Sequence, residues 1–120
     1  MRLAAILFFA WLLTACSLTG CSPGAPISPL IAAAREGDTA RIEALVKSGA
    51  DVNQRGGVND WTPLMHAVHK KQPSAIRVLI DAGADVNLTA GARGRDTALR
   101  LAEVEKYDDI ATLLRDHGAK

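Results

Sequence analysis

One stretch decides the fold of this 120-residue chain: Thr62-Pro63-Leu64-Met65-His66-Ala67-Val68, followed after a polar break by Ile76-Arg77-Val78-Leu79-Ile80-Asp81-Ala82-Gly83-Ala84-Asp85-Val86-Asn87. The Thr62 side-chain oxygen can accept a hydrogen bond from a free backbone N–H in the first turn of a helix. Pro63 suits the first helical position, where its missing N–H is not needed, and Pro73 suits the start of a second helix. Gly83 follows the last apolar residues and can adopt the left-handed conformation that ends a helix. The stretch therefore predicts two short helices joined by a turn.

Similar units lie on both sides of this stretch. The upstream unit opens with Ser28-Pro29-Leu30, and the downstream unit opens with Thr97-Ala98-Leu99. Glycines that end the three units recur at spacings of 34 and 35 residues, at Gly49, Gly83 and Gly118. A pair of short helices cannot cover its apolar faces alone, so we expect the three units to stack.

The repeated motifs resemble those of the ankyrin-repeat family. Gly-Ala-Asp-Val-Asn occurs at 49–53 and again at 83–87, and Thr-Pro-Leu opens the middle unit at 62–64. The resemblance covers roughly residues 27–119 and implies an all-α solenoid of three helix-turn-helix units joined by β-hairpin-like loops. The domain is expected at 27–120, with repeats at about 28–53, 62–87 and 97–119. The resemblance also implies that the chain binds proteins and is not an enzyme.

The third repeat departs from the pattern of the first two. Ile42, Leu45 and Val46 predict a buried stripe in the first repeat, and the second repeat has a matching stripe. The third repeat places Glu103 and Arg115 where the earlier repeats have apolar or small residues. The last repeat of a stack faces solvent on its outer side, so we interpret these polar residues as a cap and expect a monomer.

The N-terminus predicts a secretory signal. Arg2 precedes 11 consecutive apolar residues at 3–13, which is too short for a membrane span of about 20 residues. Such a run behind a positive residue is typical of a signal peptide. We therefore expect residues 1–20 to be removed.

Two cysteines follow in sequences that resemble the bacterial lipobox. These are Leu13-Thr14-Ala15-Cys16 and Leu18-Thr19-Gly20-Cys21. Lipidation at Cys21 is favoured because it leaves no odd thiol in an oxidising compartment; Cys16 is the alternative, and two ordinary cysteines near a plain cleavage site are a third. In the favoured case 21–26 forms the lipidated cysteine and its tether. The lipobox resemblance implies anchoring in the bacterial envelope, and Ser22 implies the outer membrane, facing the periplasm.

Charge and motifs exclude several function classes. Without Arg2, the 14 basic residues become 13, which equals the 13 acidic residues, so the mature chain is neutral. Neutrality argues against nucleic acid or an acidic surface as the main partner. Cysteine, serine and histidine do not occur in spacings typical of catalysis or metal binding, and we expect no enzyme activity, cofactor or metal. Asp108-Asp109 predicts a helix cap followed by a first-turn acid.

The family resemblance implies that partners bind the hairpin loops and the exposed side of each first helix. The implied contact residues are Arg35, Glu36, Val58, Asn59, Trp61, His69, Lys70, Arg93, Asp96, Val104 and Glu105. Trp61 can anchor a partner or pack along the neighbouring hairpin. Arg93 and Arg95 can bind an anionic group or be solvated loop charges.

Two hypotheses for function follow from these sequence features. The chain is a membrane-tethered module that docks one periplasmic or envelope protein, as an inhibitor or immunity protein that neutralises a toxin or enzyme. Alternatively, it is a structural accessory subunit that stabilises an envelope enzyme or complex.

Overall fold

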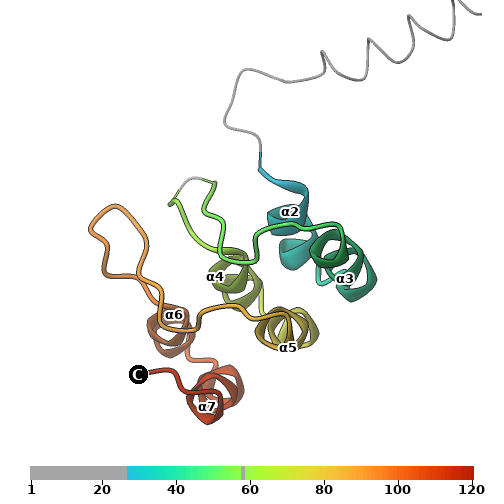
Figure 1. The fold of residues 1–120 in the computed structure, drawn as a ribbon. Coiled ribbons are helices and arrows are strands. Elements are labelled where there is room, and N and C mark those ends of the chain that lie inside the picture. The colour runs from blue at the N-terminus through green and yellow to red at the C-terminus, as the bar shows by residue number, and fades with distance from the viewer. Residues whose placement is uncertain (1–26, 58) are drawn as a thin grey trace, which may run out of the picture.

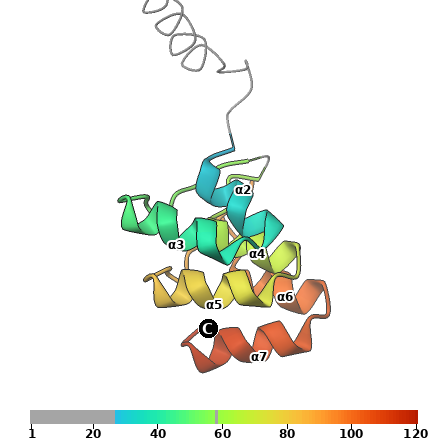
Figure 2. The ribbon, with the colours of Figure 1, turned by 90° about the vertical axis from the view of Figure 1, so that its right-hand side faces the viewer.

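The computed structural model describes residues 27–57 and 59–120, and this part of the chain contains helices in three stacked pairs (Figures 1 and 2). The helices are α2 (Pro29–Glu36), α3 (Thr39–Lys47), α4 (Pro63–His69), α5 (Pro73–Asp81), α6 (Ala98–Val104) and α7 (Asp108–Asp116). Helices α2, α4 and α6 form an inner row, and α3, α5 and α7 form an outer row (Figure 1). The all-α repeat fold is therefore confirmed, whereas the signal, the tether and Val58 lie outside the described residues.

Side-chain caps start the inner helices, as the sequence predicts. Ser28 Oγ accepts from the Ile31 N–H at 3.2 Å, and Thr62 Oγ1 accepts from the Met65 N–H at 3.3 Å. Thr97 Oγ1 accepts from the N–H three residues later at 3.1 Å. Each contact satisfies one of the backbone donors that a helix start leaves free.

The outer helices start in a less regular way. Asp38 Oδ1 accepts from the Arg41 N–H at 3.1 Å and caps α3. The prediction that Asp108 caps α7 is wrong, because Tyr107 occupies the cap position without a side-chain hydrogen bond and Asp108 is the first helical residue. Asp108 and Asp109 both lie in the first turn, where their negative charges interact favourably with the helix dipole.

Glycine ends each repeat in the expected conformation. Gly49, Gly83 and Gly118 have φ values of 95°, 96° and 94°, which lie in the left-handed region. The turns inside the repeats need a similar conformation, and here only the first repeat has glycine, at Gly37. Lys71 and Lys106 take this position in the later repeats with φ values of 53° and 59°.

The core runs through the stack between the two rows of helices. Ile42, Ile76 and Ile110 are at most 1% exposed, and small residues such as Ala33 and Ala67 let neighbouring inner helices approach closely. Some residues of the predicted apolar stripes are less buried than these core residues. Leu45, Val46 and Ile80 are only partly buried, and they pack against the flank of the core.

The outer surface of the third repeat is polar, as predicted. Glu103 and Arg115 are exposed and form an ion pair, with Arg115 Nη2 2.6 Å from Glu103 Oε1. Their exposure agrees with a solvent-facing cap, and the monomeric state stays a prediction. No helix within residues 27–57 and 59–120 has the length and apolar character needed to cross a membrane.

The loops between repeats are short hairpins that project on one side of the stack (Figure 1). Gly56 donates to the Trp61 carbonyl at 3.1 Å, and Ala90 and Asp96 exchange backbone hydrogen bonds of 2.8 and 2.9 Å. The asparagine of the repeated motif links each repeat to the next. Asn53 Oδ1 accepts from the Asp85 N–H at 2.8 Å, and Asn87 Oδ1 accepts from the Lys120 N–H at 2.9 Å.

Candidate partner-binding site

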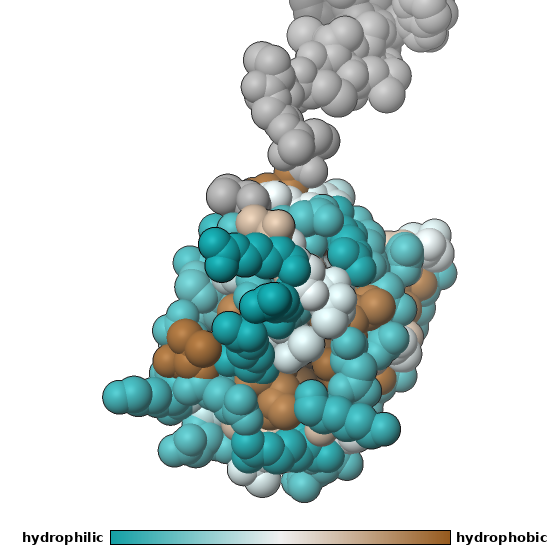
Figure 3. All heavy atoms as spheres, turned by 90° about the vertical axis from the view of Figure 1, so that its left-hand side faces the viewer, coloured by the Kyte–Doolittle hydropathy of each residue, from teal (hydrophilic) through white to brown (hydrophobic). Residues whose placement is uncertain are grey.

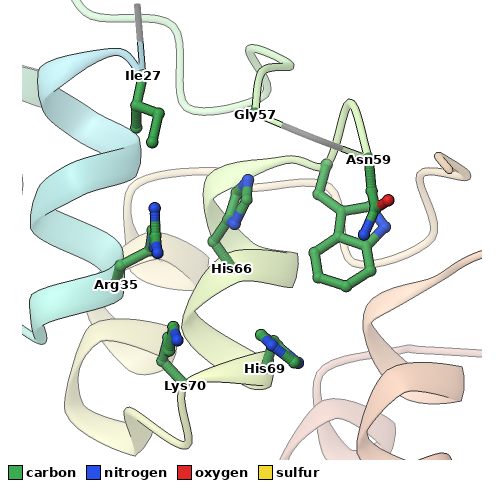
Figure 4. A pocket seen from close by; sticks show the side chains of 8 residues that line it. Ile27, Arg35, Gly57, Asn59, His66, His69 and Lys70 are labelled. Atoms are coloured by element: carbon green, nitrogen blue, oxygen red, sulfur yellow. The ribbon is translucent and has the colours of Figure 1, made fainter.

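A cavity of about 430 Å³ lies between α2, α4 and the first hairpin (Figure 4). Its lining consists of Ile27, Arg35, Gly57, Asn59, Trp61, His66, His69 and Lys70. Arg35 comes from the last turn of α2, while His66, His69 and Lys70 come from α4 and its C-terminal cap. The structure thus brings together five of the residues that the sequence predicts as contacts, namely Arg35, Asn59, Trp61, His69 and Lys70.

Trp61 packs between the two hairpins. Its side chain is only 8% exposed, and Nε1–H donates to Asp96 Oδ2 at 3.2 Å. Each of these two residues directly precedes the threonine that caps the inner helix of its repeat, so the bond joins equivalent positions. The ring also meets His66 and His69 edge to face, with centroid distances of 5.6 and 5.3 Å. Of the two roles considered for Trp61, packing is what the structure shows, and a small part of the ring still lines the cavity.

His66 fixes the first hairpin to α4. The residue is 8% exposed, and its Nε2 lies 3.0 Å from the Gly56 carbonyl oxygen, so Nε2 carries the hydrogen in the neutral ring. Burial lowers the pKa of His66 from 6.5, the hydrogen bond to Gly56 raises it in part, and the positive charges of Arg35, His69 and Lys70 lower it further. The neutral form is therefore the favoured one in the folded protein.

His69 connects the middle repeat to the third. Its Nδ1 lies 3.4 Å from Oε1 of Glu105, the C-terminal cap residue of α6. The separation allows electrostatic attraction if the ring is protonated, but Nδ1 is buried and makes no hydrogen bond among the described residues. The predicted contact residues Glu105 and His69 thus face each other across the boundary between the second and third repeats.

Two further cavities extend this site. One, of about 300 Å³, is lined by Asn59, Ala92, Arg93, Arg95, Asp96 and Arg100. The other, of about 390 Å³, is lined by Ile27, Ala32, Arg35, Glu36 and Lys70. Asn59 lines both the 430 Å³ and the 300 Å³ cavity, and Arg35 lines both the 430 Å³ and the 390 Å³ cavity, so the three cavities adjoin one another. We call the surface that they form together the hairpin face.

Two predicted contact residues, Val104 and Glu105, line none of the three cavities, and Val104 is 68% exposed at the end of α6. A third, Val58, lies outside the described residues. Sequence reasoning missed Ile27, His66 and Arg100. His66 had a usable signal, since it precedes His69 by three and Lys70 by four residues and so shares their side of the helix.

The hairpin face has groups for recognition. It combines arginine and lysine cations with an aromatic edge and an apolar side chain, and of these arginine and tryptophan are enriched at protein interfaces. Within residues 27–57 and 59–120, no three His, Cys, Asp or Glu side chains are grouped in a way that could hold a metal ion.

A family model described as ankyrin repeats in three copies matches residues 8–90 and, in a second alignment, residues 30–120. The chain belongs to the ankyrin-repeat family. It is therefore a protein-protein interaction module, of a family whose members are generally not enzymes. A comparison of this ankyrin-repeat protein with curated proteins finds no match.

Proposed function

We propose that this ankyrin-repeat protein is anchored in the bacterial cell envelope and docks one periplasmic protein on its hairpin face. The observation that carries the proposal is the group of three adjoining cavities at the predicted contact positions, the first of which is shown in Figure 4. In Figure 3 the side of the molecule with the hairpins faces the viewer, and it is mostly hydrophilic with small apolar patches. A surface of this kind suits a partner that binds reversibly and folds independently.

Support for the envelope location comes from the sequence. The 11-residue apolar run and the two lipobox-like sequences favour lipidation at Cys21, with Cys16 as the alternative. The five residues 22–26 reach at most about 17 Å when fully extended. A domain held so close to the outer membrane would bind partners at the periplasmic face of that membrane. We infer that docking there inhibits the partner, as an immunity protein inhibits a toxin or an enzyme.

A crosslinking experiment in the native cells tests the docking surface. A photoreactive amino acid replaces Asn59 or Lys70 on the hairpin face of the full-length protein, and Lys47 or Arg77 on the outer helices serves as the control position; all four residues are exposed. We expect the same protein adduct from both hairpin-face positions and none from the outer positions. Adducts only from the outer positions, or from no position, would refute docking on the hairpin face.

The same cells test the remaining parts of the proposal. The adduct partner is identified by mass spectrometry, purified and assayed for its own activity with and without the full-length ankyrin-repeat protein. Inhibition that is lost when Lys70 and Arg93 are both replaced by alanine supports the inhibitor role. An activity that rises or persists when the complex forms contradicts it.

A further inference from the structure

Positive charge is concentrated on the hairpin face. Five cationic side chains line its three cavities: Arg35, Lys70, Arg93, Arg95 and Arg100. They come from the last turn of α2, the cap of α4, the second hairpin and the first turn of α6. Residues separated by up to 65 positions in the sequence thus contribute charge of one sign to a single surface.

These five cations are not neutralised within the described residues. The ion pairs in residues 27–57 and 59–120 join other side chains: Arg41 with Glu36, His69 with Glu105, and Arg115 with Glu103. Two acids line the cavities, and both have other contacts. Glu36 lies 3.9 Å from Arg41, and Asp96 accepts the Trp61 Nε1–H. Asp60, on the tip of the first hairpin, is exposed and lines none of the three cavities.

One groove on the outer side of the stack has the opposite balance. The groove between α3 and α5 is lined by the acids Glu43 and Asp81 and by one base, Lys47. The neutral total of the mature chain therefore does not describe the local charge of the hairpin face. The expectation from net charge, that an acidic surface is not the main partner, rests on the whole chain and stays a prediction.

We infer that the partner presents an acidic, extended segment to the hairpin face. Its carboxylates pair with Arg35 and Lys70 at one end and with the arginines of the second hairpin and α6 at the other. An apolar side chain of the segment rests on Ile27 and the exposed edge of Trp61. The inference rests on the proposed function, and it adds the chemistry of the partner to it.

Arginine forms paired hydrogen bonds to carboxylate and to phosphate, and three arginines lie close together on or beside one hairpin. The lining beside these cations favours an acidic protein segment over other polyanions. Apolar lining beside the cations suits a polypeptide, which carries apolar and acidic side chains together. The positive groups also act on His66, whose pKa is lowered in part by Arg35 and Lys70.

The test begins with the photoreactive residue at position 59, which lies between the two groups of cations. The crosslinked molecule is isolated from native cells, and mass spectrometry identifies it and, for a protein, sequences the crosslinked segment. We expect a segment in which Asp and Glu outnumber Lys and Arg. A neutral or basic segment overturns the inference while leaving docking intact, an adduct with lipid or nucleic acid overturns the choice of a protein ligand, and no adduct at all refutes the proposed function itself.

A synthetic, fluorescently labelled peptide with the sequence of that segment then measures affinity by anisotropy. The full-length Arg93→Glu, Arg95→Glu double variant should bind the peptide about tenfold or more weakly, because carboxylates would then face like charges. The matched control, Lys47→Glu with Arg77→Glu on the outer helices, changes the net charge equally and should bind like the wild-type protein. Equal weakening in both double variants overturns the inference, because peptide affinity would then depend only on the net charge of the protein. No weakening in either double variant also overturns it, because affinity would then not depend on these charges.

Discussion

The middle repeat should carry more of the stability than the third, and Leu79 gives the sharpest test. Leu79 is 0% exposed and lies on α5, which packs against α3 of the preceding repeat and against α4 of its own. Leu79→Ala leaves a cavity between elements that are held on both sides and cannot close it easily. The free energy of unfolding should fall by about 2–5 kcal/mol. For about 90 folded residues the total is roughly 5–14 kcal/mol, so the loss is a large fraction of it.

Two matched leucines in the third repeat complete the experiment. Leu114 occupies the position equivalent to Leu79 and is also 0% exposed, but α7 packs chiefly against α6 alone. Leu114→Ala should therefore lower the free energy of unfolding by about 2 kcal/mol, the lower end of the range given for Leu79→Ala, because a terminal helix can relax into the cavity. Leu113 is half-buried, and its replacement by alanine should cost only about 1 kcal/mol.

Urea and thermal unfolding followed by circular dichroism measure all three variants. A domain of this size loses about 4–8 °C of Tm per kcal/mol, so Leu79→Ala should lower Tm by at least about 8 °C. A Tm unmoved by Leu79→Ala would refute its place in the core. A larger effect at Leu114 than at Leu79 would refute the argument that support from both neighbouring helices sets the cost.

Three other predictions test the pH response, the anchor and the cap. Because the pKa of His66 in the folded state lies below 6.5, the contribution of neutral His66 to stability is complete above pH 6.5 and is lost as the pH falls through the folded-state pKa. His66→Gln should flatten this part of the curve of unfolding free energy against pH. An identical slope in the wild-type protein and the variant would contradict the prediction. Replacing both Cys16 and Cys21 with serine should abolish palmitate labelling and move the protein from the membrane to the soluble or uncleaved fraction, and retained label would exclude lipidation at these cysteines. Glu103→Ala with Arg115→Leu should cause self-association in light scattering by exposing an apolar end, whereas dimers of the delipidated natural protein would show that the third repeat is an interface.

The sequence predicts the helices well because the rules that govern them are local. Caps at Ser28 and Thr62 and the glycine at Gly83 each act within a few residues, and the structure has them as expected. Asp108 shows where such a rule fails. Asp-Asp before an apolar run fits either a cap or a first turn, and here the turn geometry at Lys106 goes with a helix start one residue earlier than the cap prediction requires.

The candidate site could be predicted only in part because its geometry depends on contacts between repeats. The family resemblance placed Trp61 and Asp96 on the same face, but nothing in the sequence indicated that one would donate a hydrogen bond to the other. Net charge is a poor guide to the chemistry of a site for a related reason. It sums over the whole chain, whereas a partner responds to the charges that the fold gathers on one surface, such as Arg35 and Arg93.

Binding and stability are separable on this scaffold for most residues, and Trp61 is the exception. Arg93 and Lys70 are exposed and can change without disturbing the core between the helix rows. Trp61 is a cavity-lining residue and also the link between the two hairpins through Asp96. Its loss would leave a gap under both hairpins and would reduce binding even if the partner never touched the ring. Loss of binding in a Trp61 variant therefore does not identify a contact, and the partner interface has to be mapped with the exposed cations.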